Sequence, residues 1–300
     1  MTGKLRDAIA LAAVCACFGM ATAHADTGRL LATGGVTELE GSAGGGIVPW
    51  ALIAGYGTND QVGATTFYTT VNTGSFKLDA AGAAMGINNR VELSVARQQL
   101  DLGAIGDLAF GSALGSTAAN YQLEQNVYGI KIRLFGDAIY SQNSWIPQVS
   151  AGAQFKQNLN ATLVKALGAR DANGVDYYIA ATKLLIGAVG GRDLLLNATV
   201  RASRANQTGL LGFGGDRNNS YRAEFEGSAA VLLRPDVILG MEYRQKPNNL
   251  SVAQEDRWTD EFVAYVPNKN LSITAAFAQL GSIAGVPNQN GPYLSIQTSF

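Results

Sequence analysis

The sequence predicts an all-β protein: a transmembrane antiparallel β-barrel of about 12 strands, with short periplasmic turns and longer external loops. Many segments of about ten residues alternate between apolar and polar side chains, as membrane strands do. The last of them, residues 291–300, ends on Phe300. After the first residues, no apolar run is long enough for a membrane helix, and a closed barrel is the other structure that satisfies its backbone in lipid. A soluble β-sandwich would alternate in the same way, but the length of these segments favours the barrel.

Residues 1–25 have the pattern of a cleaved signal peptide. Lys4 and Arg6 precede a short apolar core at residues 8–20, and residues 23–25 form an A-x-A cleavage site. We therefore expect export to the periplasm and insertion into the outer membrane of a Gram-negative bacterium.

Cleavage at this site also limits the chemistry of the remaining chain. Cys15, Cys17 and His24 are the cysteines and the histidine of the sequence, and all three lie in the expected signal. Residues 26–300 therefore have no side chains for Cys-His, Ser-His-Asp or His-metal sites, so we expect neither an enzyme nor a cofactor. The charge of the remaining chain is close to balanced and slightly acidic, which argues against nucleic-acid binding.

The barrel is expected to occupy residues 45–300. Residues 26–44 are rich in glycine, and we expect a periplasmic N-terminal segment there, although the composition equally permits a partial plug of the lumen. Pro49 lies in the first expected strand and cannot donate to a ladder, so a bulge is expected there. The strands are expected at 45–56, 74–86, 89–102, 123–136, 145–157, 174–187, 192–205, 219–233, 236–248, 256–267, 270–281 and 291–300.

The connections between these strands alternate between short and long. The long ones are expected at 57–73, 103–122, 158–173, 206–218, 249–255 and 282–290. Short periplasmic turns alternating with long external loops place both termini in the periplasm. Residues 159–167 are compatible with a helix within one long loop, ended by Gly168.

The polar face of the strands carries charges, which we expect to line the lumen. These candidate lumen-lining residues are Lys131, Arg133, Lys156, Arg201, Arg222, Glu224, Glu226, Glu242, Arg244 and Lys246. Two interpretations remain open: a selective constriction, or mutual pairing that closes the interior.

Two turns predict the register of their hairpins. A turn at residues 234–236 sets Glu226 opposite Arg244 and Glu224 opposite Lys246. A two-residue turn at 268–269 places Phe262, Ala264 and Val266 on the outer face.

Asp171, Asn173 and Asp176 form a weak calcium candidate, because they place oxygen ligands at nearly alternate positions. Their spacing departs from the EF-hand pattern. An Asn-Gly turn that leads into a strand explains the same residues.

Five stretches resemble the outer-membrane-type family catalogued as domain of unknown function 3034. They are residues 40–51 (EGSAGGGIVPWA), 90–98 (RVELSVARQ), 165–169 (KALGA), 205–216 (ANQTGLLGFGGD) and 242–250 (EYRQKPNNL). The resemblance covers nearly all of the chain after the signal. It implies an outer-membrane barrel and supplies no activity or site residue.

Two functions fit these features. The first is a narrow channel or facilitator for small polar solutes, which rests on the expected barrel size and the mixed inner charge. The second is a non-transport barrel with a structural, binding or adhesive role in the envelope. The expected partners are outer-membrane lipid, small solutes, and the barrel-assembly machinery, which would bind the C-terminal strand ending at Phe300.

Overall fold

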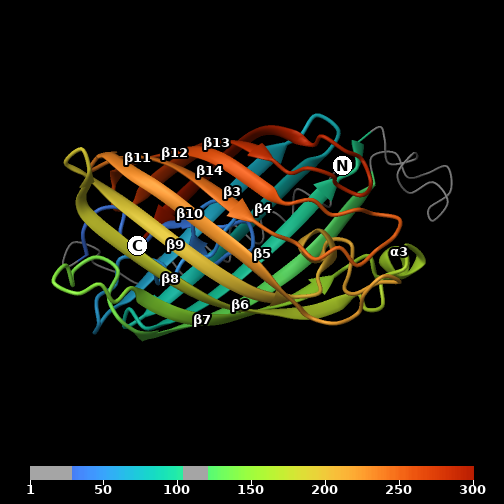
Figure 1. Cartoon of the computed structure of the whole chain (residues 1–300), viewed down its shortest axis with the longest axis horizontal. Helices are drawn as coiled ribbons and strands as arrows, with labels where there is room; N and C mark the ends of the chain where they lie inside the picture. Colours follow the sequence, from blue (N-terminus) through green and yellow to red (C-terminus); the bar gives the residue numbers. More distant parts are fainter. Residues whose placement is uncertain (1–28, 104–120) are drawn as a thin grey trace.

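The computed structural model describes residues 29–103 and 121–300, and within these ranges twelve antiparallel strands close into a barrel (Figure 1). The expected signal peptide and most of the expected loop 103–122 lie outside the described residues. The barrel strands are β3 (Val62–Asn72), β4 (Lys77–Ile87), β5 (Val91–Asp101), β6 (Gln122–Phe135), β7 (Gln148–Asn158), β8 (Asn173–Val189), β9 (Arg192–Ser203), β10 (Arg222–Arg234), β11 (Val237–Arg244), β12 (Trp258–Asn268), β13 (Leu271–Gln279) and β14 (Asn290–Ser299). The predicted fold class is therefore confirmed.

Each strand pairs with its neighbour in sequence, and the first and last strands close the ring. β14 pairs antiparallel with β3, with Ile296 opposite Tyr68. Phe300 extends this seam, because its N–H donates to Ala64 O at 2.8 Å and its carbonyl accepts from Ala64 N at 3.0 Å. The described barrel therefore has no open edge whose backbone groups would face lipid unpaired.

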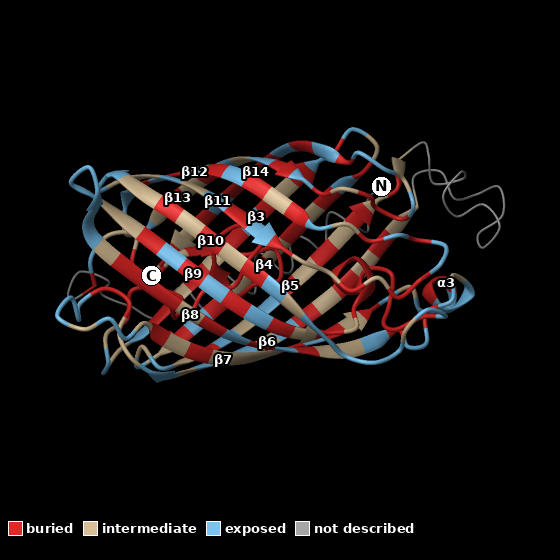
Figure 2. Cartoon of the chain, viewed as in Figure 1, coloured by how far each residue is buried: buried red, intermediate tan, exposed pale blue. Residues whose placement is uncertain are grey.

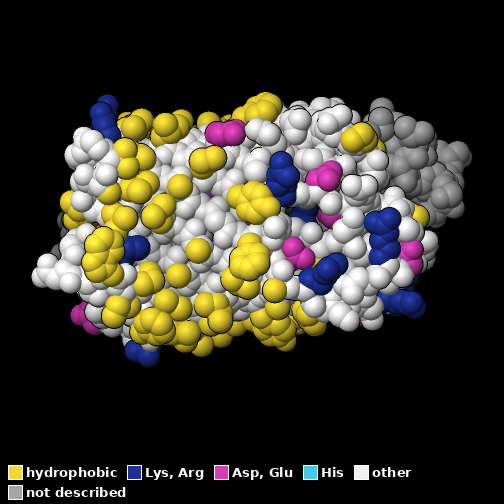
Figure 3. Space-filling model, viewed as in Figure 1, with side chains coloured by type: hydrophobic (Ala, Val, Ile, Leu, Met, Phe, Trp, Pro, Cys, Tyr) yellow, Lys and Arg dark blue, Asp and Glu magenta, His cyan; other side chains and the backbone are white. Residues whose placement is uncertain are grey.

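The two-residue period of the strands gives the barrel an apolar outer face and a polar inner face. Along β5, Leu93 and Val95 point outward and are exposed, whereas Glu92 points inward and is buried. The alternation is visible as bands along the strands (Figure 2). On the outer surface, hydrophobic side chains cover most of the length, and charged side chains gather toward one end (Figure 3).

The two ends of the barrel differ, and we name them by their connections. The loop end carries the longer loops, including α3 (Ala161–Ala166) and η3 (Asn206–Gly209), and the turn end carries mostly short turns (Figure 1). The helix predicted at 159–167 is confirmed by α3, which buries Leu163 and Val164. Among the described residues, no helix has the length and apolar character needed to cross a membrane.

The prediction that residues 45–56 form the first barrel strand is wrong. The barrel begins at Val62 with β3, inside the range expected to be a loop, and residues 45–56 lie in the lumen. The sequence did not predict β3, because its two faces do not differ in polarity. Its outward positions include Thr66 and Thr70, and its inward positions include Phe67 and Val71. The continuous apolar run at 47–54 is instead typical of a segment that is buried on all sides.

The predicted register is confirmed for one hairpin and wrong for the other. Glu226 lies opposite Arg244 as predicted, whereas Lys246 follows the end of β11 and bonds a loop carboxylate instead of Glu224. Phe262 and Val266 are buried in the lumen, and the outward residue Val263 pairs with Ala275. A bulge shifts this hairpin by one residue, and a one-residue shift moves every side chain to the other face. Ala264, the third residue that was predicted on the outer face, is also buried in the lumen.

Candidate functional site

Residues 29–61, which we call the lumen segment, enter the barrel, and residues 36–57 fill its interior. Its short strands β1 (Val36–Thr37) and β2 (Ala43–Gly44) pair as a small hairpin, and every residue from 36 to 57 is buried. Figure 2 shows buried chain between the strands of the barrel. Of the two roles left open for residues 26–44, the described part of this range supports the plug.

The tip of the hairpin lies very close to the barrel wall. Gly41 has a φ of +98°, and a Cβ atom there would lie 3.2 Å from Ala96 Cβ on β5. Glycine is therefore favoured both by the backbone conformation and by the close approach.

Side chains of the wall satisfy the irregular backbone of the lumen segment. Lys131 Nζ donates to Ala43 O and Leu52 O, both at 2.9 Å. Thr199 Oγ1 donates to Pro49 O at 2.9 Å, and Ile47 N donates to Glu242 Oε2 at 2.7 Å. A buried backbone group without a partner is costly, so these contacts account for how an irregular chain can occupy the lumen.

The most highly charged part of the interior surrounds Glu40. Glu40 Oε1 contacts Lys156 Nζ, and Glu40 Oε2 lies 2.8 Å from Arg244 Nη2 and 3.4 Å from Arg201 Nη1. We call these three basic residues the cation ring; they come from β7, β11 and β9. All four side chains are at most 2% exposed.

Two carboxylates of the wall also contact the cation ring. Asp176 Oδ2 lies 2.6 Å from Lys156 Nζ, and Glu226 Oε1 lies 2.5 Å from Arg201 Nε and 3.4 Å from Arg244 Nε. Three cations are thus surrounded by the carboxylates of Asp176 and Glu226 from the wall and of Glu40 from the lumen segment, and Glu38 Oε2 of the segment lies 3.8 Å from Arg244 Nη1. Buried charges are tolerated only when they are paired in this way.

The two glutamates at the hairpin tip differ in their protonation. Burial raises the pKa of Glu38 to about 8, and the nearby Glu40 carboxylate adds to the shift. Burial alone would also raise the pKa of Glu40, but the attraction of Arg244, Lys156 and Arg201 lowers it below its ordinary range. At neutral pH the cation ring therefore holds an ionised Glu40, while Glu38 largely keeps its proton.

A second buried ion pair holds the lumen segment closer to the turn end. Lys131 Nζ lies 3.0 Å from Glu92 Oε1. Glu92 also accepts from Ser42 Oγ at 2.9 Å and from Ala54 N at 2.9 Å. Both charges of this pair belong to the wall, so the pair is neutral with or without the segment.

Asp260 on β12 is a buried carboxylate of a different kind. It lies opposite Glu242 in the β11–β12 ladder and is 1% exposed. Among the described residues, neither of its carboxylate oxygens has a hydrogen-bond partner, and the Tyr293 hydroxyl is also unpartnered. Both groups border the lumen segment, because a Cβ atom on Gly46 would lie 3.2 Å from each.

The loop end of the lumen is covered by the loop that carries η3. Asn158 Nδ2 donates to Gly209 O and Leu210 O, both at 2.9 Å. Lys246 Nζ lies 2.7 Å from Glu255 Oε2, and Glu255 accepts from Gln207 N at 2.7 Å. Burial lowers the pKa of Lys246 and raises that of Glu255.

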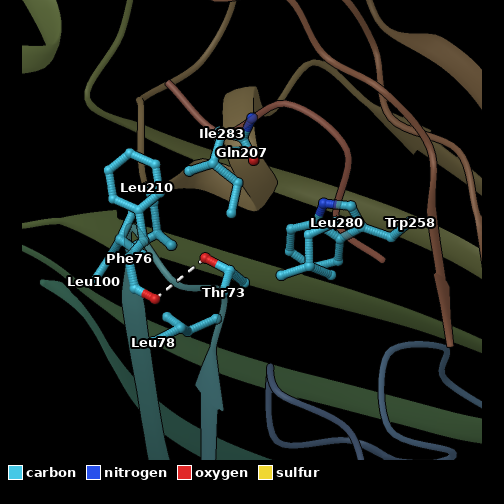
Figure 4. A pocket seen from close by; sticks show the side chains of 9 residues that line it. All are labelled: Thr73, Phe76, Leu78, Leu100, Gln207, Leu210, Trp258, Leu280 and Ile283. Carbon is cyan, nitrogen blue, oxygen red and sulfur yellow. Dashed lines mark hydrogen bonds between the residues drawn. The ribbon is translucent and has the colours of Figure 1, made fainter. Parts of the chain in front are cut away.

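A small cavity of about 10 Å³ lies under this loop, close to one water in size. Thr73, Phe76, Leu210 and Trp258 are among its lining residues, and Thr73 Oγ1 donates to Phe76 O (Figure 4). Its lining is mostly apolar, and its size does not admit a solute.

The ten candidate lumen-lining residues fall into three groups. Seven lie within the filled interior or its covered loop end: Lys131, Lys156, Arg201, Glu226, Glu242, Arg244 and Lys246. Arg133 lies at the turn end, where Arg133 Nη2 is 3.0 Å from Asp137 Oδ2. Arg222 is exposed and Glu224 half-buried at the first positions of β10, at the loop end.

Sequence reasoning missed Glu38 and Glu40, which were expected in a periplasmic segment. A signal was available: seven of the ten candidate lumen residues are basic and three are acidic. An interior with this excess of cations needs carboxylates from elsewhere in the chain, because buried charges need partners.

The three residues of the calcium candidate have separate partners. Asp176 contacts Lys156 and accepts from Ser203 Oγ at 2.7 Å. Asp171 is half exposed and lies 2.9 Å from Arg204 Nη1, and Asn173 Oδ1 accepts from the backbone of β7. Within residues 29–103 and 121–300, no group of three or more His, Cys, Asp or Glu side chains is placed to hold a metal ion.

Comparison with known proteins gives one family and several barrels. The family described as protein of unknown function (DUF3034) matches residues 33–297. The NanC porin is similar with a TM-score of 0.45 and 11% identity, covering 80% of this chain and 98% of that chain. The outer membrane channel COG4313 from Pseudomonas putida F1 has a TM-score of 0.39 and 11% identity, covering 84% and 96%. Outer membrane phospholipase A from Escherichia coli has a TM-score of 0.37 and 8% identity, covering 82% and 93%.

These solved structures include both channels and an enzyme, at low similarity, and they carry no argument about activity. No curated protein matches the sequence.

Proposed function

This chain belongs to the DUF3034 family, and we propose that it is a channel for small polar solutes that the lumen segment closes. The proposal places the barrel in a Gram-negative outer membrane, with the loop end outside the cell. The C-terminal strand, which ends at Phe300, would be the part that the barrel-assembly machinery binds.

The observation that carries the proposal is the chemistry of the wall beneath the lumen segment. Charged, amide and hydroxyl side chains line much of it, and they bind the segment through hydrogen bonds and ion pairs, as Lys131 and Thr199 do. An apolar cluster also joins part of the wall, including Phe67 and Phe262, to Trp50 of the segment. Water can replace the polar contacts when the segment leaves, whereas exposing the apolar part is costly and favours the closed state. The polar part of the wall is suited to a water-filled pore.

The alternative is a permanently closed barrel with a structural or binding role. The filled lumen favours it, because the cavity under the η3 loop is about the size of one water. The two functions differ in one respect: a channel requires the lumen segment to move.

A disulfide across the interface tests that movement. Ala43 and Ala54 of the lumen segment form one buried cluster with Ala84 of β4. Cysteine at position 84 can therefore be combined with cysteine at 43 or 54, in a chain of residues 26–300 that has no other cysteine.

The measurement is single-channel conductance in a planar bilayer. We expect the reduced double variant to show discrete steps, the oxidised protein to be silent, and a reductant to restore the steps. The single variant Ala84→Cys controls for oxidation elsewhere. Silence of the wild-type chain and of every reduced variant would support the closed barrel instead.

A further inference from the structure

The cation ring has one place for a carboxylate that the wall does not fill. Lys156, Arg201 and Arg244 belong to strands and stay with the wall, as do Asp176 and Glu226. The third carboxylate, Glu40, leaves if the lumen segment leaves, and Glu38, whose Oε2 lies 3.8 Å from Arg244 Nη1, leaves with it. Three cations would then face two carboxylates, which is a local excess of one positive charge.

This excess is confined to the cation ring. The Lys131–Glu92 pair belongs wholly to the wall, and the Lys246–Glu255 pair joins the end of β11 to a loop, so neither changes its charge. Glu242 and Asp260 face each other on β11 and β12 and stay with the wall. The change in charge that follows departure of the segment is therefore located at the ring, and recognition would occur there.

The geometry of the ring suits a carboxylate group. Three cations converge on the two oxygens of Glu40: Lys156 Nζ donates to Oε1, Arg244 Nη2 donates to Oε2, and Arg201 Nη1 lies 3.4 Å from Oε2. Charge-assisted contacts of this kind are strong and directional. Arg201 also lies over the Tyr178 ring, at 5.4 Å from its centroid, which helps to hold the guanidinium in place.

We infer that the solutes carry a carboxylate group, and that this group takes the place of Glu40 in the cation ring when the lumen segment moves. This inference rests on the proposed channel function. Glu40 is then an internal mimic of the solute, and a carboxylate-bearing solute competes with the segment for the ring.

The experiment removes the Glu40 side chain and supplies a carboxylate from solution. Propionate reproduces the end of the glutamate side chain, and propionamide has the same shape without the charge. We expect Glu40→Ala to lower the midpoint of thermal unfolding in detergent, and propionate to restore about half of that loss by binding the folded state. Propionamide should restore none of it.

Asp260→Ala is the matched control. It also removes a buried carboxylate from the lumen, but Asp260 has no cation within ion-pair distance among the described residues. Propionate should therefore not rescue this variant. Equal rescue of both variants, or rescue by propionamide, would overturn the inference.

A second measurement begins with the wild-type chain, so its first result does not depend on the folding of a variant. Gluconate, glucose and glucosamine are similar in size and differ in charge. We expect gluconate to enter proteoliposomes about tenfold faster than glucose, and Arg244→Gln to remove most of this difference. Arg97→Gln, which changes an arginine at an outward position of β5, should keep it.

The two proposals fail in different ways. A chain that admits all three sugars equally remains a channel, and only the carboxylate inference is lost. A chain that admits none of them in any form is no channel, and the inference falls with it even if propionate binds.

Discussion

The two sides of the lumen hold the same segment by different chemistry. The strands β5–β11 supply the buried cations of the interior, including Lys131 and the cation ring. The opposite side, β12–β14 with β3 and β4, presents hydroxyl, amide, small and aromatic side chains, for example Thr37 of the segment bonding Gln297 at 2.7 Å. Among the described residues of that side, Asp260 is the buried acidic side chain.

This difference gives the two sides different roles. We call the role of the charged side anchoring, because it fixes the position of the segment, and the role of the neutral side fitting, because it only packs against the segment. An ion pair buried with good geometry strongly penalises the loss of either partner, so the charged side fixes the position of the segment. Neutral hydrogen bonds contribute less each and exchange more readily with water. We therefore expect a moving segment to be released from the charged side and to slide along the neutral side.

Loss of one cation on the charged side should have the largest effect. Arg244→Ala removes the contacts to Glu40 and the hydrogen bond to Ile47 O at 2.9 Å. We expect a loss of about 3–5 kcal/mol in unfolding free energy, because Glu40 is left with fewer partners in a buried site. Urea unfolding followed by heat-modified gel mobility would measure it. A loss no larger than that of a neutral-side variant would contradict the comparison.

Loss of two basic residues should also alter the pore. In the conducting state, Arg244→Ala combined with Lys246→Ala should shift ion selectivity toward cations, because both positive charges face the interior. Reversal potentials across a salt gradient would show the shift. Unchanged selectivity would mean that these two residues do not line the path.

Raising the pH should weaken closure through Glu38. Its pKa in the closed state, about 8, is raised above the ordinary 4.5, so its contribution is fully present below pH 4.5 and is lost as the pH rises through 8. Glu40, whose pKa is lowered, changes in the opposite sense and only in acid. Glu40, Arg201, Arg244 and Glu226 are the charges that act on Glu38.

The measurement compares wild type with Glu38→Gln between pH 5 and 9. We expect the unfolding midpoint in urea to fall with pH in wild type, and to fall less in the variant, since glutamine does not titrate. Other buried carboxylates contribute equally to both chains and cancel in the difference. Parallel curves would exclude Glu38 as the cause.

The sequence was sufficient for the barrel because alternation is a local property of each strand. Glu226 opposite Arg244 could be predicted because the turn between β10 and β11 fixes the register. The position of β3 could not be predicted, because a strand between lipid and a filled lumen need not differ in polarity between its two faces, as Thr66 and Phe67 show. The shifted hairpin at Phe262 depends on a bulge, which leaves no clear signature in the residues.

The filled lumen was harder to predict for a physical reason. The segment that fills it contacts wall residues that are distant in sequence, for example Glu40 and Lys156, which are 116 positions apart, and no local pattern records such contacts. The composition indicated that acidic partners were missing, since basic residues outnumber acidic ones among the candidate lumen positions. Their partners lay in a Gly-rich stretch whose lack of periodicity is typical of a tail and of a plug alike.

On the neutral side, replacing the acidic group of Asp260 should stabilise the protein in alkali. Asp260→Asn keeps the shape and removes an ionisable group that has no hydrogen-bond partner among the described residues. We expect a gain of about 1 kcal/mol at alkaline pH and little change at neutral pH, because ionising a buried carboxyl group without a partner is costly. Asp176→Asn is the matched control and should destabilise, since Asp176 pairs with Lys156. A destabilised Asp260→Asn would show that this carboxylate has a partner in solution.

The smallest effect is expected for a single hydroxyl on the neutral side. Thr69 Oγ1 on β3 donates to Ser295 Oγ on β14 at 2.8 Å, and both residues are buried in the lumen. Thr69→Val keeps the volume and removes this hydrogen bond, which should cost about 1 kcal/mol. The urea midpoint should fall by much less than in Arg244→Ala, and the conductance of the open state should be unchanged. A loss as large as that of the arginine variant would show that the hydroxyl side anchors the segment as firmly as the cations do, and the division between anchoring and fitting would not hold.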